Sequence, residues 1–225
     1  MPFEIPNFDV DSFVRATLAE DLGPTGRDVT SESVIPADMQ FEGVMDSRDP
    51  ITVAGLPIAA AFFQALDPGM EIEILVGEGE AVPGGTDMMR LTGNARAMLT
   101  AERSALNTAQ HLSGIATLTR SYVDAMQGKA ILLDTRKTLP GLRHLEKYAV
   151  RTGGGHNHRM GLHDAVLINV AERDLNLLLR EAFGKLRTCV MLMVNAGNVT
   201  STEPTAPWAR LSLRPNHSIP LVNSS

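Results

Sequence analysis

The stretch that decides the fold is residues 131–138, ILLDTRKT, in which a short apolar segment runs directly into charged and polar side chains. Residues 141–151 then have a helical pattern with a basic, polar face, and the apolar residues 165–168 predict a second buried strand. The order strand, helix, strand is typical of a parallel α/β unit. Ligands of such folds bind at the carboxyl ends of the strands, so we expect functional side chains from Asp134 onward.

The residues before this unit predict a different kind of sheet. Helices are expected at 11–22, 56–66 and, as one long helix, 100–127; strands are expected at 39–46, 71–76 and 88–92; a loop is expected at 23–30. This order indicates a small α+β domain with a mostly antiparallel sheet. Gly114 lies inside the long helix and weakens it relative to Ala, so we expect it to allow the close approach of a neighbouring backbone.

The composition excludes several classes of protein. The chain has 225 residues, of which 44% are hydrophobic and 20% are charged, as in an ordinary soluble domain. A net charge of −6 disfavours a nucleic-acid-binding protein, although it leaves room for a local basic pocket. No segment has the roughly 20 apolar residues of a membrane helix, and the N-terminus lacks the pattern of a secretory signal. The single cysteine, Cys189, cannot form an internal disulfide, so we expect a cytoplasmic protein.

Cationic side chains are the first candidates for a binding site. Arg136 offers a planar fork for a carboxylate or phosphate, and Lys137 adds a mobile charge beside it. The alternative is a solvated loop with a surface ion pair to Asp134, because adjacent Arg and Lys residues are common on protein surfaces. Arg103, in the first turn of the predicted long helix, is placed against the helix dipole, which weakly favours an anionic partner.

Residues 153–159, GGGHNHR, form a second candidate site. Three glycines let the backbone come close to a ligand and expose its N–H groups. A metal site could use His156 and His158 with Asp164 or His163 as a third ligand, but the spacing matches no zinc motif closely. Turn glycines with one hydrogen-bonded core histidine are the structural alternative.

Several ordered strings extend these two candidates. They are ERSALN at 102–107, LSGIAT at 112–117, DTRKTLPGLR at 134–143, KYAV at 147–150 and GGGHNHRMGL at 153–162, with EDLG at 20–23 and DVT at 28–30 before them. Together they resemble the quinolinate phosphoribosyltransferase family, also called carboxylating nicotinate-nucleotide pyrophosphorylases. The resemblance covers about residues 10–168. It implies an N-terminal α+β domain over residues 1–110 and the start of an α/β barrel over 111–168.

The resemblance also implies a reaction. The family transfers a phosphoribosyl group from phosphoribosyl pyrophosphate to quinolinate, releasing pyrophosphate and carbon dioxide and giving nicotinate mononucleotide for NAD synthesis. Mg²⁺ is expected to accompany the pyrophosphate, with its protein ligands unknown. The substrate-binding residues that the resemblance implies are Arg103, Thr135, Arg136, Lys137, His158 and Arg159. Lys137 and His158 are the expected catalytic residues, and Arg103 is expected to cross a homodimer interface into the partner's site.

The chain departs from the family pattern after Ile168. Asn169 stands where the family has a lysine, and we find no counterpart of the later barrel strands in residues 169–225. We therefore expect an incomplete barrel and a divergent, partly disordered tail, with residues 195–225 in loop or disorder. We interpret the break as a reading-frame change or truncation near codon 169. Two other hypotheses stay open: a non-catalytic homologue that dimerises and binds quinolinate without turnover, and a pyrophosphorylase for a different aromatic acid.

Overall fold

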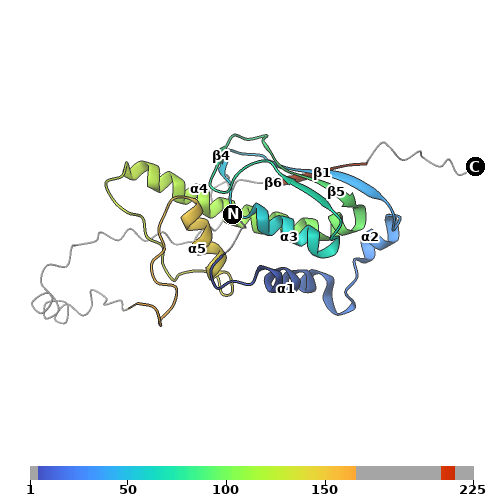
Figure 1. Ribbon diagram of the computed structural model, residues 1–225, viewed down its shortest axis with the longest axis horizontal. Coiled ribbons are helices and arrows are strands. Elements are labelled where there is room, and N and C mark those ends of the chain that lie inside the picture. The colour runs from blue at the N-terminus through green and yellow to red at the C-terminus, as the bar shows by residue number, and fades with distance from the viewer. Residues whose placement is uncertain (1–4, 166–208, 216–225) are drawn as a thin grey trace, which may run out of the picture.

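An antiparallel sheet forms one layer of the molecule. The computed structural model describes residues 5–165 and 209–215 (Figure 1). The strand order of the sheet is β3-β5-β1-β6, with antiparallel pairing throughout. These strands are β1 (Gln40–Ser47), β3 (Glu71–Ile74), β5 (Asp87–Asn94) and β6 (Ala209–Pro215); β2 (Ile51–Thr52) and β4 (Ala81–Val82) form a separate short pair.

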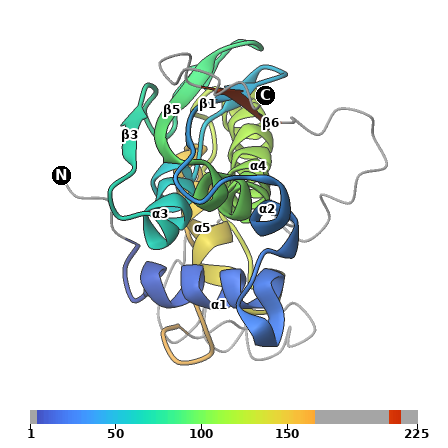
Figure 2. The same cartoon turned by 90° about the vertical axis from the view of Figure 1, so that its right-hand side faces the viewer.

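The helices pack beneath this sheet. They are α1 (Val10–Leu22), α2 (Val29–Val34), α3 (Leu56–Leu66), α4 (Ala95–Met126) and α5 (Arg143–Thr152), with a 3-10 turn, η1, at Gly23–Thr25. In Figure 2 the sheet lies on one side of α3 and α4, and α1 lies on the other side. The described residues contain no helix long and apolar enough to cross a membrane.

The hydrophobic core is formed mainly by the sheet and by helices α3 and α4. Burial alternates along the second half of β1, where Gly43, Met45 and Ser47 are buried, so one face of the strand packs inward. α3 is apolar along most of its length, and its Phe62 and Phe63 are fully buried. This packing explains why the helix and strand patterns of the first hundred residues are strong.

A half-buried glutamate, Glu78, connects α5 to this first domain. Glu78 accepts the N–H groups of Gly55 at 2.7 Å and Leu56 at 3.0 Å, at the beginning of α3. The hydroxyl of Tyr148, on α5, donates to the same carboxylate. Burial raises the pKa of Glu78 above its ordinary value, and the three donors oppose that shift.

A second contact joins the end of α5 to α4. A Cβ placed at Gly153 would lie 2.5 Å from the carbonyl oxygen of Ala116 and 2.7 Å from Cβ of Thr119. The close approach therefore occurs at Gly153. The role predicted for Gly114 is wrong, because a Cβ at that position would meet nothing within 4 Å.

Most predicted elements of the first domain are confirmed. Helices at 11–22 and 56–66 correspond to α1 and α3, and the three predicted strands to β1, β3 and β5. The long helix begins at Ala95, earlier than expected, because the Asn94 side chain caps it by accepting the N–H of Ala97 at 3.1 Å. The sequence boundary proposed at residues 110 and 111 lies within this continuous helix.

Two loop predictions are wrong in part. The segment 23–30 contains η1 and the beginning of α2, because Asp28 accepts the N–H groups of Thr30 and Ser31 and so caps a helix. Residues 209–215, predicted as loop or disorder, form β6 and pair with β1. Here tertiary pairing overrides a weak local preference.

The parallel α/β unit is present in reduced form. The strand predicted at 131–133 is a single parallel bridge between Leu133 and His156. The strand predicted at 165–168 lies outside the described residues except for Ala165. The fold is thus an α+β domain with an antiparallel sheet, followed by the beginning of a parallel unit.

Candidate substrate site

The parallel bridge brings two loops together, residues 134–142 and residues 156–164. The N–H of His156 donates to the carbonyl of Leu132 at 2.8 Å, and the N–H of Asp134 donates to the carbonyl of His156 at 3.0 Å. Both loops follow the ends of these paired segments, where the sequence predicted functional side chains.

A buried ion pair lies directly beneath these loops. Asp134 and Lys147 are 3% and 1% exposed, and the Lys147 ammonium donates to Oδ1 of Asp134. Burial raises the pKa of Asp134, while its hydrogen bonds to Lys147 and to the N–H of His158 oppose that shift. The surface ion pair considered for Asp134 is therefore wrong: its partner is a helix residue inside the protein.

A second buried carboxylate holds the first loop. Glu146 is fully buried, and its Oε1 lies 3.0 Å from Nε2 of His111 on α4. Both carboxylate oxygens also lie within reach of the N–H of Leu139, at 3.3 and 3.4 Å. Glu146 thus fixes the middle of the loop against α4 and α5.

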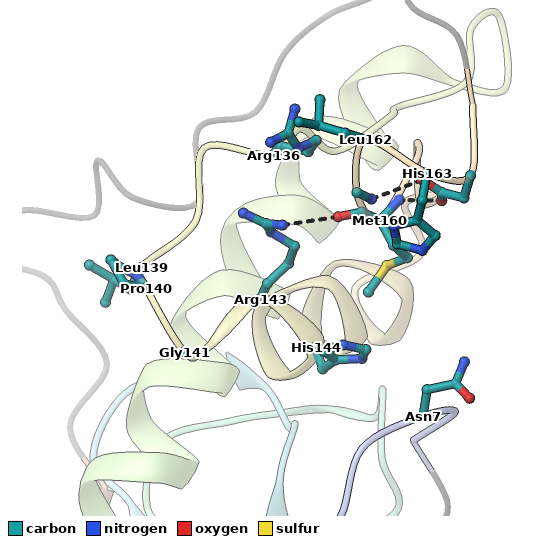
Figure 3. Close-up of a pocket in the computed structure, with 12 residues that line it drawn as sticks. Asn7, Arg136, Leu139, Pro140, Gly141, Arg143, His144, Met160, Leu162 and His163 are labelled. Atoms are coloured by element: carbon teal, nitrogen blue, oxygen red, sulfur yellow. Dashed lines mark hydrogen bonds between the residues drawn. The ribbon is translucent and has the colours of Figure 1, made fainter.

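The two loops and the beginning of α5 enclose a cavity of about 810 Å³ (Figure 3). In Figure 3, Leu139 and Pro140 lie on one side of the Arg143 side chain, and Met160 and His163 lie on the other. The residues that line it are Asn7, Arg136, Leu139, Pro140, Gly141, Arg143, His144, Met160, Gly161, Leu162, His163 and Asp164. The lining thus contains two arginines and two histidines but only one carboxylate, Asp164, a composition that suits an anion.

The two arginines of the cavity differ in their bonding. Arg143 donates from Nε to Oγ1 of Thr138 at 3.2 Å and from Nη1 to the carbonyl of Met160 at 3.2 Å, so it joins the two loops. Nε of Arg136 is buried and has no hydrogen-bond partner among the described residues. Because a buried unpaired N–H is costly, Arg136 is suited to receive a ligand oxygen.

The other predicted site residues lie outside the lining of the cavity. Oγ1 of Thr135 accepts the N–H of Lys137 at 3.0 Å, and Lys137 is exposed. His158 and Arg159 are half-buried in the neighbouring loop, where Nη1 of Arg159 donates to the carbonyl of Ala165 at 3.0 Å. Arg103 is exposed on α4. Of the six predicted substrate-binding residues, Arg136 is thus the one that lines the described cavity.

Sequence reasoning missed Arg143 and His144. Arg143 is the first residue of α5, where a cation is unfavourable for the helix dipole. That mismatch was a usable signal. The same argument for Arg103 is wrong, because α4 begins at Ala95 and Arg103 lies beyond its first turn. The ring of His144 stacks on Phe8 with centroids 5.9 Å apart, a contact between distant residues that no local pattern predicts.

The described residues do not fit a metal held by protein side chains. They contain no group of three His, Cys, Asp or Glu side chains with the geometry of a metal site. Asp164 instead accepts the N–H groups of Gly161 at 2.9 Å and Met160 at 2.6 Å, and these two bonds lower its pKa. The metal hypothesis for the histidines of residues 153–159 is thus wrong within the described part of the chain.

Comparison with known proteins places this geometry in a family. The N-terminal domain of quinolinate phosphoribosyl transferase matches residues 28–113, and the C-terminal domain of the same enzyme matches residues 115–203. The chain belongs to the quinolinate phosphoribosyltransferase family. The match runs on past Ile168, where we expected the resemblance to stop.

Relatives of the quinolinate phosphoribosyltransferase family are similar over most of this chain. The chloroplastic nicotinate-nucleotide pyrophosphorylase [carboxylating] of Arabidopsis thaliana is 44% identical over 163 residues, covering 72% of this chain and 46% of that protein. A probable nicotinate-nucleotide pyrophosphorylase [carboxylating] of Synechocystis is 46% identical over 160 residues, covering 71% and 53%. The chain spans about half the length of the curated relatives it matches.

Solved structures of the family agree with the fold. The nicotinate-nucleotide pyrophosphorylase of Francisella tularensis is 40% identical with a TM-score of 0.67, covering 75% of this chain and 60% of that one. The corresponding protein of Ehrlichia chaffeensis is 31% identical with a TM-score of 0.70, covering 83% and 69%. The antiparallel α+β domain and the start of the parallel unit therefore follow the quinolinate phosphoribosyltransferase fold.

Proposed function

We propose that this chain binds quinolinate and takes part in its conversion, with phosphoribosyl pyrophosphate, to nicotinate mononucleotide, carbon dioxide and pyrophosphate, a reaction of NAD biosynthesis. The observation that carries the proposal is Arg136, which lines a cavity with a cationic lining and whose buried Nε has no hydrogen-bond partner among the described residues. The names of the relatives support the choice of substrate.

The chemistry of quinolinate suits this cavity. Quinolinate is a dianion, and one of its carboxylates would accept from the guanidinium group of Arg136 in the planar geometry that such groups favour. Arg143, already bonded to both loops, would add charge without moving. Side chains that are already held in place orient the substrate before the reaction begins, which lowers the entropic part of the barrier.

The remaining residues enter the proposal with defined roles. Lys137 and His158 are proposed as catalytic residues, with Thr135 and Arg159 beside them on the same two loops. Because Arg103 is exposed on α4, outside the lining of the cavity, its proposed place is the site of the other protomer in a homodimer. Mg²⁺ is proposed to arrive with the pyrophosphate group, since the described carboxylates do not assemble a site for it. We propose a cytoplasmic location, supported by the single cysteine.

A second candidate function is binding without turnover. Arg136 lines the described cavity, whereas the two proposed catalytic residues, Lys137 and His158, do not. A chain of this kind would fold, dimerise and bind quinolinate, and it would lend Arg103 to a full-length partner.

One assay separates the two functions. The purified 225-residue chain is incubated with quinolinate, phosphoribosyl pyrophosphate and Mg²⁺, and release of carbon dioxide is compared with that of a heat-inactivated sample. Turnover supports the transferase. Quinolinate binding by calorimetry without turnover supports the second function, especially if the chain restores activity to a full-length relative that lacks the equivalent of Arg103. Preference for nicotinate over quinolinate, or no binding of either, contradicts both.

A further inference from the structure

The backbone of His158 is held from both sides by one buried ion pair. Its N–H donates to Oδ1 of Asp134 at 2.8 Å. Its carbonyl accepts from the Lys147 ammonium at 3.0 Å. The same ammonium donates to Asp134, so the carboxylate, the ammonium and the peptide groups flanking one α-carbon form a closed set of hydrogen bonds.

Asn157 adds a further link to this set. The hydrogen-bond network orients its amide so that the nitrogen donates to Oδ2 of Asp134 at 2.8 Å and to the carbonyl of Lys147 at 2.9 Å. Three segments meet here: the strand end that carries Asp134, helix α5 with Lys147, and the loop with Asn157 and His158. Each contributes a polar group that is satisfied by the other two.

The burial of the pair calls for an explanation beyond stability. Removing two charges from water is costly, and well-packed apolar residues of similar size often stabilise a core as well as a buried ion pair does. What apolar residues cannot supply is directional bonding to a chosen peptide unit. Here the directional bonds converge on His158.

We propose that Asp134 and Lys147 are positioning residues, which fix the backbone of His158 and thereby the directions of the His158 and Arg159 side chains beside the anion site. This inference rests on the proposed function for its link to quinolinate. The contacts that carry it belong to the chain itself. A displacement of about 1 Å at such a position lowers the efficiency of a site even when every side chain is retained.

The test replaces the pair with uncharged groups of similar size. In the double variant Asp134→Asn/Lys147→Met, the ammonium that binds the His158 carbonyl is lost and neither residue is left as an unpaired charge. The matched control is Tyr148→Phe, which changes the next residue of α5 and removes the hydroxyl that donates to Glu78. Both variants are made in the complete chain.

Two measurements follow each variant. The first is hydrogen exchange of the His158 amide by NMR, which reports the backbone without any ligand. The second is the Kd for quinolinate. We expect the double variant to exchange about tenfold faster at His158 and to bind quinolinate about tenfold more weakly. We expect the control to change both values less than about twofold, even where it lowers Tm by a similar amount.

Other outcomes overturn the inference. A folded double variant with unchanged exchange and unchanged Kd would show that the pair does not position His158. Equal changes of exchange and Kd in the Tyr148→Phe control would show that the pair contributes only to general stability. If the double variant does not fold, Asp134→Asn alone decides by the same two criteria. If the native chain does not bind quinolinate, the proposed function fails, and the exchange of the His158 amide still decides whether the pair positions this loop.

Discussion

Charged side chains inside this protein are in two situations. Asp134, Glu146 and Lys147 are almost completely buried, and each has its partners within the protein. Nε of Arg136 is also buried, but it has no partner among the described residues. Since burial of an unpaired donor is unfavourable, we assign the first group to the stability of the fold and propose Arg136 for ligand binding.

Substitution of Arg136 tests this distinction. Arg136→Ala removes a charge-assisted hydrogen bond of roughly 1.5–3 kcal/mol, so we expect the Kd for quinolinate to rise at least about tenfold in calorimetry. Arg136→Lys keeps the charge without the planar fork, so its Kd for quinolinate is expected to lie between those of the native chain and Arg136→Ala. Arg151→Ala, an exposed arginine of α5 outside the lining of the cavity, is the control. An unchanged Kd in Arg136→Ala would remove this residue from the site.

Glu78 predicts a pH dependence of stability. Burial raises its pKa in the folded protein, so above its ordinary value of 4.5 the folded protein binds more protons than the unfolded chain. This carboxyl group therefore lowers the free energy of unfolding as the pH rises from 4.5 through the raised folded value. In Glu78→Gln the free energy of unfolding is expected to lose this pH dependence. The variant is also expected to be less stable than the native chain, because an amide oxygen is a weaker acceptor than a carboxylate.

The measurement is urea unfolding of both proteins across this pH range. The difference between their free energies of unfolding should shrink as the pH rises. A constant difference would mean that the Glu78 pKa is the same in the folded and unfolded states. At lower pH, Asp28 makes the free energy of unfolding rise with pH, because its bonds to Ser31 lower its pKa. This contribution is the same in the native chain and in Glu78→Gln, so it cancels in the difference.

At the scale of elements, α4 connects the two parts of the chain. It packs with α3 and α2, and its Ala116 and Thr119 meet Gly153 at the end of α5. The space at Gly153 is limited by the backbone of Ala116, which cannot rotate away as a side chain can. The contact between these helices therefore depends on the absence of a Cβ at one position.

Two glycine substitutions test this contact against each other. Gly153→Ala should lower the free energy of unfolding by about 1–3 kcal/mol through overpacking. Gly114→Ala should raise it by about 1 kcal/mol, because Ala favours a helix interior and its Cβ meets nothing within 4 Å. Both values come from urea or thermal unfolding. Equal effects at the two positions would contradict the assignment of the close approach to Gly153.

At the scale of the whole molecule, a strand from early in the chain and one from late in the chain meet in one sheet. β6 pairs with β1 over its full length, with Ser212 opposite Val44 and Leu213 opposite Gly43, as Figure 1 shows at the sheet. This pairing places β6 at the edge and β1 in the interior of the sheet. An unpaired β1 would offer an open edge to other chains.

Proline substitutions in β6 test the pairing. Neighbouring residues of an antiparallel strand direct their N–H groups to opposite sides, so either Ser212→Pro or Leu213→Pro must remove a ladder hydrogen bond to β1. Whichever of the two proline variants loses this hydrogen bond is expected to show faster hydrogen exchange in the peptide that covers β1, measured by mass spectrometry. Alanine at the same two positions keeps the N–H and is the control. Equal exchange in all four variants would contradict the pairing of β1 with β6.

Local patterns were sufficient for much of this protein. The apolar spacing of α1 and α3 and the alternation in β1 arise from residues close together in the chain, and their elements were predicted nearly to their ends. The string ILLDTRKT likewise predicted where the candidate site lies, and its Arg136 lines the cavity. The family was also evident from the order of such strings.

Tertiary structure decided the rest, because the remaining features depend on pairs of residues far apart in sequence. α5 has a basic, polar pattern, yet Lys147 is buried, since Asp134 and the His158 carbonyl meet it inside the protein. Arg143 and His144 join Arg136 in the cavity because two loops fold over the beginning of α5. The sequence by itself determined the family and most helices and strands of the first domain, but not α2 or β6. The arrangement of the loops determined that Asp134, Glu146 and Lys147 have partners in the interior and that Nε of Arg136 has none among the described residues. A buried charge is stable only when a partner reaches it in space, and these partners are far apart in sequence.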